Sequence, residues 1–98
     1  MQDFTDKLVV ITGAASGVGR SLAVAMAEAG ARVLAADIDG AGLLETKAAL
    51  DARGAVSYTS ECDVTSQASV DALAARAFDE LGGVHLVFAN AGIAAGEA

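Results

Sequence analysis

Residues 8–19 read Leu-Val-Val-Ile-Thr-Gly-Ala-Ala-Ser-Gly-Val-Gly, an apolar run that meets three closely spaced glycines. The run Leu8–Ile11 predicts a strand buried on both faces, as in a parallel sheet. The segment from Val18 to Ala29 has the periodicity of a helix. The start of a helix offers unpaired backbone N–H groups and the positive end of the helix dipole, which together favour phosphate. This stretch therefore predicts a nucleotide-binding unit of strand, loop and helix.

The residues of this glycine loop have separate expected roles. Gly13 permits the turn after the strand, and Gly17 lets a pyrophosphate approach without a Cβ in the way. Gly19 lets the helix pack closely against the strands, and the Ser16 hydroxyl can add a hydrogen bond to phosphate. Three glycines alone would be weak evidence for such a site, but their position between a strand and a helix makes the evidence much stronger.

Short β-rich or apolar runs alternate with longer segments of helical periodicity along the whole chain. In order, the expected strands and helices are Lys7–Thr12, Val18–Ala29, Arg32–Ala36, Ala41–Arg53, Val56–Glu61, Ser66–Leu81 and Val84–Ala89. Right-handed crossovers then favour an α/β fold, a partial Rossmann-like doubly wound parallel sheet of strand order 3-2-1-4 and connectivity β-α-β-α-β-α-β. The first two helices would cover one face of the sheet and the third the other.

The third helix has the clearest periodicity, and Thr65 or Ser66 is its expected cap. Its apolar stripe comprises Val70, Leu73, Ala74, Ala77, Phe78 and Leu81. The apolar run Val84–Phe88 predicts a last strand buried on both faces, like the first.

Asp37 lies at the end of the second expected strand, 18 residues after Gly19, where the adenosine ribose lies in a β-α-β nucleotide fold. Its carboxylate can accept hydrogen bonds from both ribose hydroxyls and would repel a 2′-phosphate. The loop has no Arg or Lys before Gly17, and Ile38 follows Asp37, so no cation is placed to receive that phosphate. Arg20 is expected to form a surface ion pair. The sequence therefore predicts a preference for NAD(H) over NADP(H).

Composition restricts the class of protein. Fifty-four per cent of the 98 residues are hydrophobic, which predicts a globular core, and the net charge of −7 opposes binding to nucleic acid or to an anionic membrane. The chain has no apolar stretch of about 20 residues and an acidic rather than signal-like start, so we expect a cytoplasmic protein without a membrane partner. Cys62 and His85, the single Cys and His, cannot build a structural zinc site, and no metal is expected. Cys62 is interpreted as a buried packing residue.

A P-loop NTPase is the alternative that Gly19-Arg20-Ser21 suggests, because it resembles the end of G-x-x-x-x-G-K-[ST]. The pattern fails at two fixed positions. The first glycine would be residue 14, which is Ala, and the phosphate-binding lysine is replaced by Arg20.

In these residues the chain resembles the short-chain dehydrogenase/reductase family, and the resemblance covers almost its whole length. Thr12–Gly19 matches the family's T-G-x-x-x-G-x-G loop, and Asp37 matches its NAD-preferring acid. Asp63-Val64 matches the D-V pair after the third strand, and Ala89–Gly92 matches N-N-A-G after the fourth.

The resemblance implies a dinucleotide site assembled from four segments. Ser16, Gly17 and Val18 would contact the pyrophosphate, Asp37 and Ile38 the adenosine ribose, Asp63 and Val64 the adenine, and Asn90, Ala91 and Gly92 the ribose of the cofactor and the central strands. Two positions depart from the family pattern: Ala89 replaces a first Asn, and His85 replaces a common Asp and is interpreted as a residue at the start of the strand.

The family's catalytic Asn, Ser and Tyr-x-x-x-Lys all lie beyond residue 98, so no catalytic residue is assigned to this segment. Tyr58 has Cys62 rather than Lys four residues later and is not the missing acid. We therefore expect residues 1–98 to be a single truncated NAD-binding domain, inactive alone, of an oxidoreductase for an alcohol or ketone. The complete protein is expected to be a homo-oligomer. A nucleotide-binding module without catalysis and an inactive fragment remain as alternatives.

Overall fold

The structure, a computed structural model, describes residues 4–90. Its elements in chain order are β1 Leu8–Thr12, α1 Gly17–Glu28, β2 Arg32–Asp37, α2 Gly40–Asp51, β3 Ser57–Glu61, α3 Gln67–Ala75, the π-helix η1 Arg76–Glu80, and β4 Leu86–Ala89. These bounds differ by only one or two residues from those expected for every element except the third helix. Among the described residues, no helix has both the length and the apolar character that a membrane-spanning segment needs.

The four strands form one parallel sheet of order β3-β2-β1-β4. Val10 of β1 lies opposite Leu34 of β2 on one side and Val87 of β4 on the other. All five residues of β1 are buried, as the apolar run predicts for a central strand. The predicted strand order and connectivity are confirmed.

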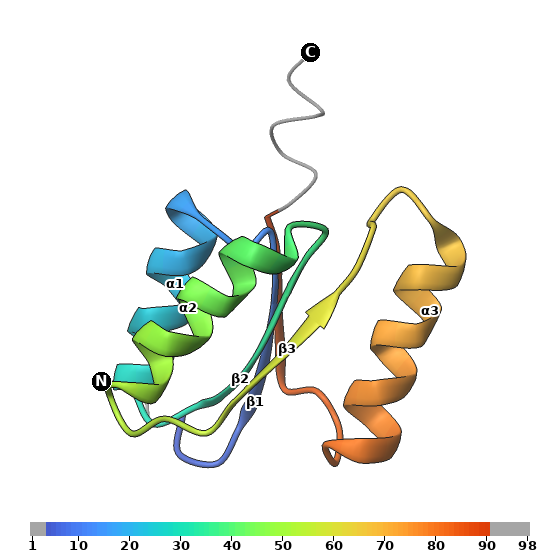
Figure 1. The fold of residues 1–98 in the computed structure, drawn as a ribbon. Coiled ribbons are helices and arrows are strands. Elements are labelled where there is room, and N and C mark those ends of the chain that lie inside the picture. The colour runs from blue at the N-terminus through green and yellow to red at the C-terminus, as the bar shows by residue number, and fades with distance from the viewer. Residues whose placement is uncertain (1–3, 91–98) are drawn as a thin grey trace.

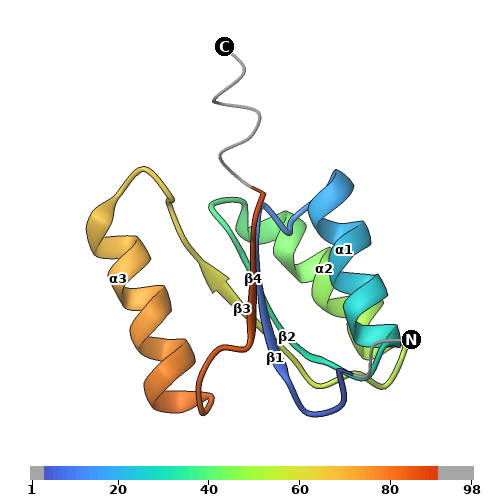
Figure 2. The same cartoon turned by 180° about the vertical axis from the view of Figure 1, so that it is seen from behind.

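Helices cover both faces of this sheet (Figures 1 and 2): α1 and α2 lie on one face and α3 on the other. The two faces have separate cores, because successive residues of a strand point to opposite sides. Val9 and Ile11 of β1 belong to the core beneath α1 and α2, whereas Leu8 and Val10 belong to the core beneath α3. The chain crosses from one face to the other after β3, which leaves the carboxyl ends of β1 and β4 at the point where the winding direction changes.

The third helix departs from its expected form. Ser66 caps it as predicted, because its side chain accepts from the Ser69 N–H at 3.3 Å, but α3 ends at Ala75 and η1 continues it. Within the expected stripe, Leu73 and Ala77 are buried, whereas Phe78 is 62% exposed. Phe78 still lies on the same face as the rest of the stripe, because it lines the same apolar groove as Leu73 and Ala77, and its exposure follows from the openness of that groove.

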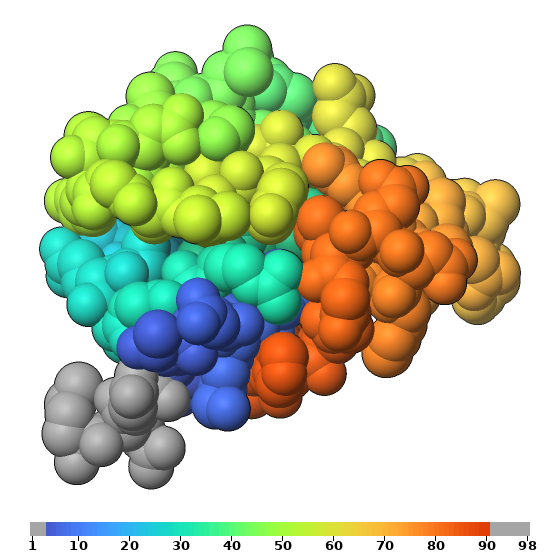
Figure 3. Space-filling model, turned by 90° about the horizontal axis from the view of Figure 1, so that it is seen from below, coloured from blue at the N-terminus to red at the C-terminus, as the bar shows by residue number. Residues whose placement is uncertain are grey.

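β4 is also less buried than its apolar sequence predicts. Leu86 and Phe88 pack against the core beneath α1 and α2, but Val87 points to the other face and is 54% exposed. The expectation that this strand is buried on both faces is therefore wrong, because Val87 faces an open groove between α3 and the sheet. Between α3 and the sheet lies an apolar groove of about 520 Å³, and Val87 lines it together with Phe78. In Figure 3 the orange surface of α3 and η1 stands to one side of the remaining molecule.

Two cationic side chains from the flanking helices bind the outer edge of β3. The register with β2 turns the carbonyl groups of Ser57 and Thr59 away from the sheet. Lys47, from α2, donates to Ser57 O at 3.2 Å, and Arg76, at the start of η1, donates to Thr59 O. The two cations come from opposite faces, so β3 is tied to a helix on each side.

Candidate functional site

The glycine loop connects the carboxyl end of β1 to the start of α1. The Ala14 N–H donates to Ala36 O at 3.1 Å, which fixes the loop against β2. Ser16 is the N-cap residue of α1, with an extended backbone, and its side chain makes no capping hydrogen bond. Ser16, Gly17 and Val18 are exposed. The predicted pyrophosphate residues therefore lie together at an accessible helix N-terminus, where the first N–H groups have no partner within the helix.

Gly17 and Gly19 meet different steric demands in this loop. A Cβ on Gly19 would overlap the carbonyl oxygen of Gly13 and lie 2.6 Å from its carbonyl carbon, so α1 packs here with no room for a side chain. A Cβ on Gly17 would meet no atom within 4 Å, but its φ of +56° favours glycine. Gly19 thus has the close-packing geometry expected of it, and the space beside Gly17 is open.

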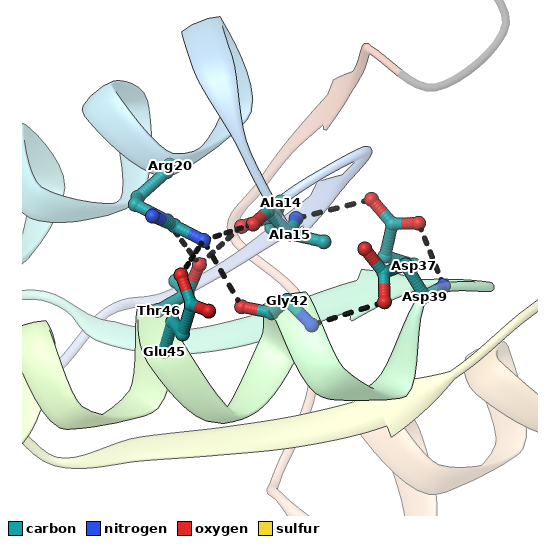
Figure 4. A network of polar contacts seen from close by, with 8 residues as sticks. All are labelled: Ala14, Ala15, Arg20, Asp37, Asp39, Gly42, Glu45 and Thr46. Carbon is teal, nitrogen blue, oxygen red and sulfur yellow. Dashed lines mark hydrogen bonds and ion pairs between the residues drawn. The ribbon is translucent and has the colours of Figure 1, made fainter.

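Asp37, the last residue of β2, lies directly beside the loop (Figure 4). Its Oδ2 accepts from the Ala15 N–H at 3.0 Å, and its Oδ1 accepts from the Asp39 N–H at 3.0 Å. A carboxylate oxygen can accept a second hydrogen bond, so each oxygen keeps acceptor capacity for a ligand hydroxyl. The carboxylate is half-buried and held in one orientation by two backbone groups.

The start of α2 packs against the same loop. Asp39 caps α2, because its Oδ1 accepts from the Gly42 N–H at 3.0 Å. A Cβ on Gly42 would lie 2.7 Å from the Ala15 Cβ, so a glycine is needed where this helix approaches the loop. Gly42 was not predicted from the sequence to be a site residue. A glycine inside a helical pattern is nevertheless a signal of close backbone approach.

Arg20 points beneath α2 and not toward the exposed face of the loop. Its Nε donates to Thr46 Oγ1 at 2.9 Å, and its Nη2 donates to Ala15 O and, at 3.2 Å, to Gly42 O. Its ion pair with Glu45, at 3.4 Å, agrees with the expected ion pair, but the guanidinium is also part of an inter-helix network. Thr46 was not identified from the sequence, because no local pattern relates it to a residue 26 positions away.

Asp63 and Val64 follow β3 at the same end of the sheet. Asp63 Oδ1 accepts from the backbone N–H and the hydroxyl of Thr65, at 2.9 and 2.6 Å. These hydrogen bonds hold the pKa of Asp63 below its usual range, with the hydroxyl as the main cause. Val64 is 38% exposed and lines the apolar groove, and Ile38, after Asp37, is 67% exposed. The apolar side chains expected near the cofactor are therefore accessible.

Asn90 follows β4 and connects it to the glycine loop, because its Nδ2 donates to Gly13 O at 3.4 Å. The neighbouring predicted site residues, Ala91 and Gly92, lie outside the described residues. His85, directly before β4, accepts the Leu8 N–H at Nδ1, at 2.9 Å, and donates its own N–H to Leu8 O. It therefore extends the contact with β1 to the residue before the start of β4.

Two other residues considered in the sequence occupy packing positions. Cys62 is 4% exposed, and burial, with a smaller effect of the Asp63 charge, raises the pKa of its thiol. Tyr58 is half-buried in β3, and the Arg76 guanidinium lies 6.0 Å from its ring centroid. Neither lies in the loop that joins β1 to α1.

The arrangement fits a dinucleotide. An accessible helix start can receive a phosphate, and the oriented carboxylate of Asp37 can accept from a ribose diol. The four strands are parallel, so their carboxyl ends lie together at one end of the sheet. The predicted site residues among 4–90 lie at those ends, directly after them or at the start of α1. The geometry alone thus supports nucleotide binding and shows no constellation of acid, base and nucleophile in this loop.

Comparison with known proteins agrees with this geometry. The sequence model of the short chain dehydrogenase family matches residues 7–98. The chain is 45% identical over 87 residues to a 1-deoxy-11-beta-hydroxypentalenate dehydrogenase of Streptomyces exfoliatus. The match covers 89% of this chain and 32% of that protein.

Solved structures give the same result. A hydroxysteroid dehydrogenase from Escherichia coli superposes with a TM-score of 0.87 at 33% identity, over 92% of this chain and 38% of that one. A short chain dehydrogenase/reductase from Burkholderia phymatum, in complex with NAD, superposes with a TM-score of 0.83 at 41% identity, over 89% of this chain and 31% of that one. The chain spans about a third of the length of these proteins. It belongs to the short chain dehydrogenase family.

Proposed function

We propose that this chain forms the NAD(H)-binding part of an oxidoreductase. The observation that carries the proposal is the position of Asp37: its carboxylate is fixed 3.0 Å from the Ala15 N–H, beside the accessible start of α1. Ser16, Gly17 and Val18 would contact the pyrophosphate, Gly13 would permit the turn that brings them there, and Gly19 would let α1 pack closely behind them. Asp37 and Ile38 would hold the adenosine ribose, Asp63 and Val64 the adenine, and Asn90, Ala91 and Gly92 the cofactor's other ribose.

The preference for NAD(H) over NADP(H) follows from charge. A hydrogen bond to a charged group contributes about 1.5–3 kcal/mol, and the two acceptor oxygens of Asp37 could each receive a ribose hydroxyl. A 2′-phosphate would instead bring negative charge toward the carboxylate. Arg20, the cation nearest in sequence to the loop, is bound to Thr46, Gly42 and Ala15, which keeps it from neutralising that phosphate.

The cofactor would supply hydride transfer, and the protein would bind and orient it. We propose an alcohol or ketone as the substrate of the complete protein, since the similar proteins are named as dehydrogenases of such compounds. Proton transfer and substrate binding are assigned to residues beyond position 98, so residues 1–98 alone would bind the cofactor without turnover. We also propose that the complete protein is a homo-oligomer.

Calorimetric titration of residues 1–98 with NAD and NADP tests this proposal. The wild-type chain is expected to bind NAD more tightly than NADP. Asp37→Ala should weaken NAD binding by about tenfold to a hundredfold while leaving NADP binding unchanged or tighter. Asp71→Ala is the matched control, because it removes the same charge from the exposed surface of α3. Equal affinities for NAD and NADP, or no binding by the folded chain, would contradict the proposal.

A further inference from the structure

The peptide group between Ala14 and Ala15 is held at both of its ends. Its carbonyl, Ala14 O, accepts the Thr46 hydroxyl at 2.6 Å, and its N–H, on Ala15, donates to Asp37 at 3.0 Å. A trans peptide is planar, and its oxygen and hydrogen point in opposite directions. The orientation that Thr46 imposes on the carbonyl therefore also decides where the N–H points (Figure 4).

Thr46 is placed for this contact by the packing of α2 and by Arg20. Its side chain is fully buried, so its hydroxyl cannot exchange these partners for water. The oxygen accepts from Arg20 Nε at 2.9 Å, which leaves its proton for Ala14 O. Arg20 also donates to the next carbonyl, Ala15 O, so two successive carbonyl groups of the loop are held by side chains.

We propose that Thr46, supported by Arg20, is a positioning residue for Asp37. By fixing the 14–15 peptide, it aims the Ala15 N–H at the Asp37 carboxylate and keeps that carboxylate oriented for the adenosine ribose. Thr46 itself would touch no ligand and would act only through the 14–15 peptide plane. The claim that ribose recognition depends on it rests on the proposed function, whereas the coupling between Thr46, Ala15 and Asp37 does not.

Substitutions at position 46 separate the hydroxyl from the packing of the side chain. Thr46→Val keeps the shape but removes the hydrogen-bonding group, and it leaves Ala14 O and Arg20 Nε without their buried partner. Thr46→Ser keeps the hydroxyl. Arg53→Gln is the control for contact between α1 and α2, because Arg53 binds Glu28 at the opposite end of the helix pair, 3.2 Å away.

Two measurements on the 98-residue chain test the proposal. The first is amide hydrogen exchange of Ala15 by NMR, which we expect Thr46→Val to accelerate at least tenfold, with Thr46→Ser and Arg53→Gln close to wild type. The second is the ratio of NAD to NADP affinity, measured by calorimetry. Thr46→Val should lower this ratio about tenfold. A general loss of folded protein would instead lower the apparent affinities for both ligands equally and leave the ratio unchanged.

A double-mutant cycle identifies the route of the effect. If Thr46 acts through Asp37, Thr46→Val should change NAD affinity much less in an Asp37→Ala background than in the wild type. Additive effects, or a serine variant as impaired as the valine variant, would overturn the proposal. If Thr46→Val does not fold, Arg20→Lys takes its place, because it keeps the charge and loses the Nε donor.

The same experiments distinguish the inference from the proposed function. A wild-type chain that binds neither dinucleotide would refute the proposed function and the ribose claim, and Ala15 exchange would still decide whether Thr46 orients the peptide. NAD binding with an unchanged ratio in Thr46→Val would leave the proposed function standing and refute the positioning role.

Discussion

Replacing Gly19 with alanine tests the packing on which the candidate site depends. The added Cβ would overlap Gly13 O and lie 2.6 Å from the Gly13 carbonyl carbon and 3.0 Å from the Ala14 Cα. All three are backbone atoms, so relief requires α1 to move away from the loop. Overpacking costs about 1–3 kcal/mol when side chains can adjust, and backbone movement places this case at the upper end. We expect Gly19→Ala to lower the free energy of unfolding by about 3 kcal/mol.

Gly17→Ala is the matched comparison in the same loop. Its Cβ would meet no atom within 4 Å, and the only cost is the left-handed backbone at φ +56°, about 1–2 kcal/mol for alanine. Urea denaturation followed by far-ultraviolet circular dichroism should place the midpoint of Gly19→Ala about 1 M below that of Gly17→Ala. NAD binding should also distinguish the two roles. Gly17→Ala should stay folded and lose NAD affinity, because its methyl group would occupy the open space that we assign to the pyrophosphate. Equal midpoints, or a Gly19→Ala variant as stable as wild type, would refute the steric reasoning.

Three further predictions concern individual side chains. Because burial raises the pKa of Cys62, its thiol should react with a disulfide reagent at pH 8 much more slowly in the folded chain than in urea, and equal rates would contradict its burial. Thr65 lowers the pKa of Asp63, so this interaction stabilises the folded chain at neutral pH and is lost as the pH falls through the folded-state value; Thr65→Ala should raise that pKa in a carboxyl-carbon NMR titration. His85→Ala should remove the acceptor for the Leu8 N–H, lower stability by about 1 kcal/mol and speed exchange of the Leu8 amide, and unchanged protection of that amide would count against the bond.

Much of the fold could be predicted because its signals are local. The apolar run of β1, the periodicity of the helices and the spacing of the loop glycines each depend on residues close together in the chain, and the handedness of the crossovers then restricts the strand order. The third helix shows the limit of this reasoning. The π turn at Arg76–Glu80 leaves no mark in the hydrophobic pattern. The pattern places Phe78 on the apolar stripe, but its 62% exposure depends on how α3 packs over the sheet, which the local sequence does not encode.

The candidate site likewise has parts that could be predicted from local sequence and parts that could not. The glycine loop and Asp37 could be located by their spacing, and the structure brings them into contact. The contacts that hold them there join residues far apart in the sequence. Arg20 and Thr46 are separated by 26 positions and meet only because α1 and α2 pack side by side. Such contacts follow from the angle and distance between helices, which no single stretch of sequence encodes.

Lys47 and Arg76, which bind backbone carbonyl groups of β3, make the two edges of the sheet differ. An added strand needs free carbonyl acceptors along the edge that it joins, and Lys47 and Arg76 already occupy Ser57 O and Thr59 O. On the opposite edge, β4 pairs with β1 alone among the strands of residues 4–90. Any further strand, from the same chain or from a second copy, would therefore meet less competition beside β4. Among the described residues, the two edges of the sheet therefore differ, because cationic side chains already bind two backbone carbonyl groups of β3 and none of those of β4 is bound in this way.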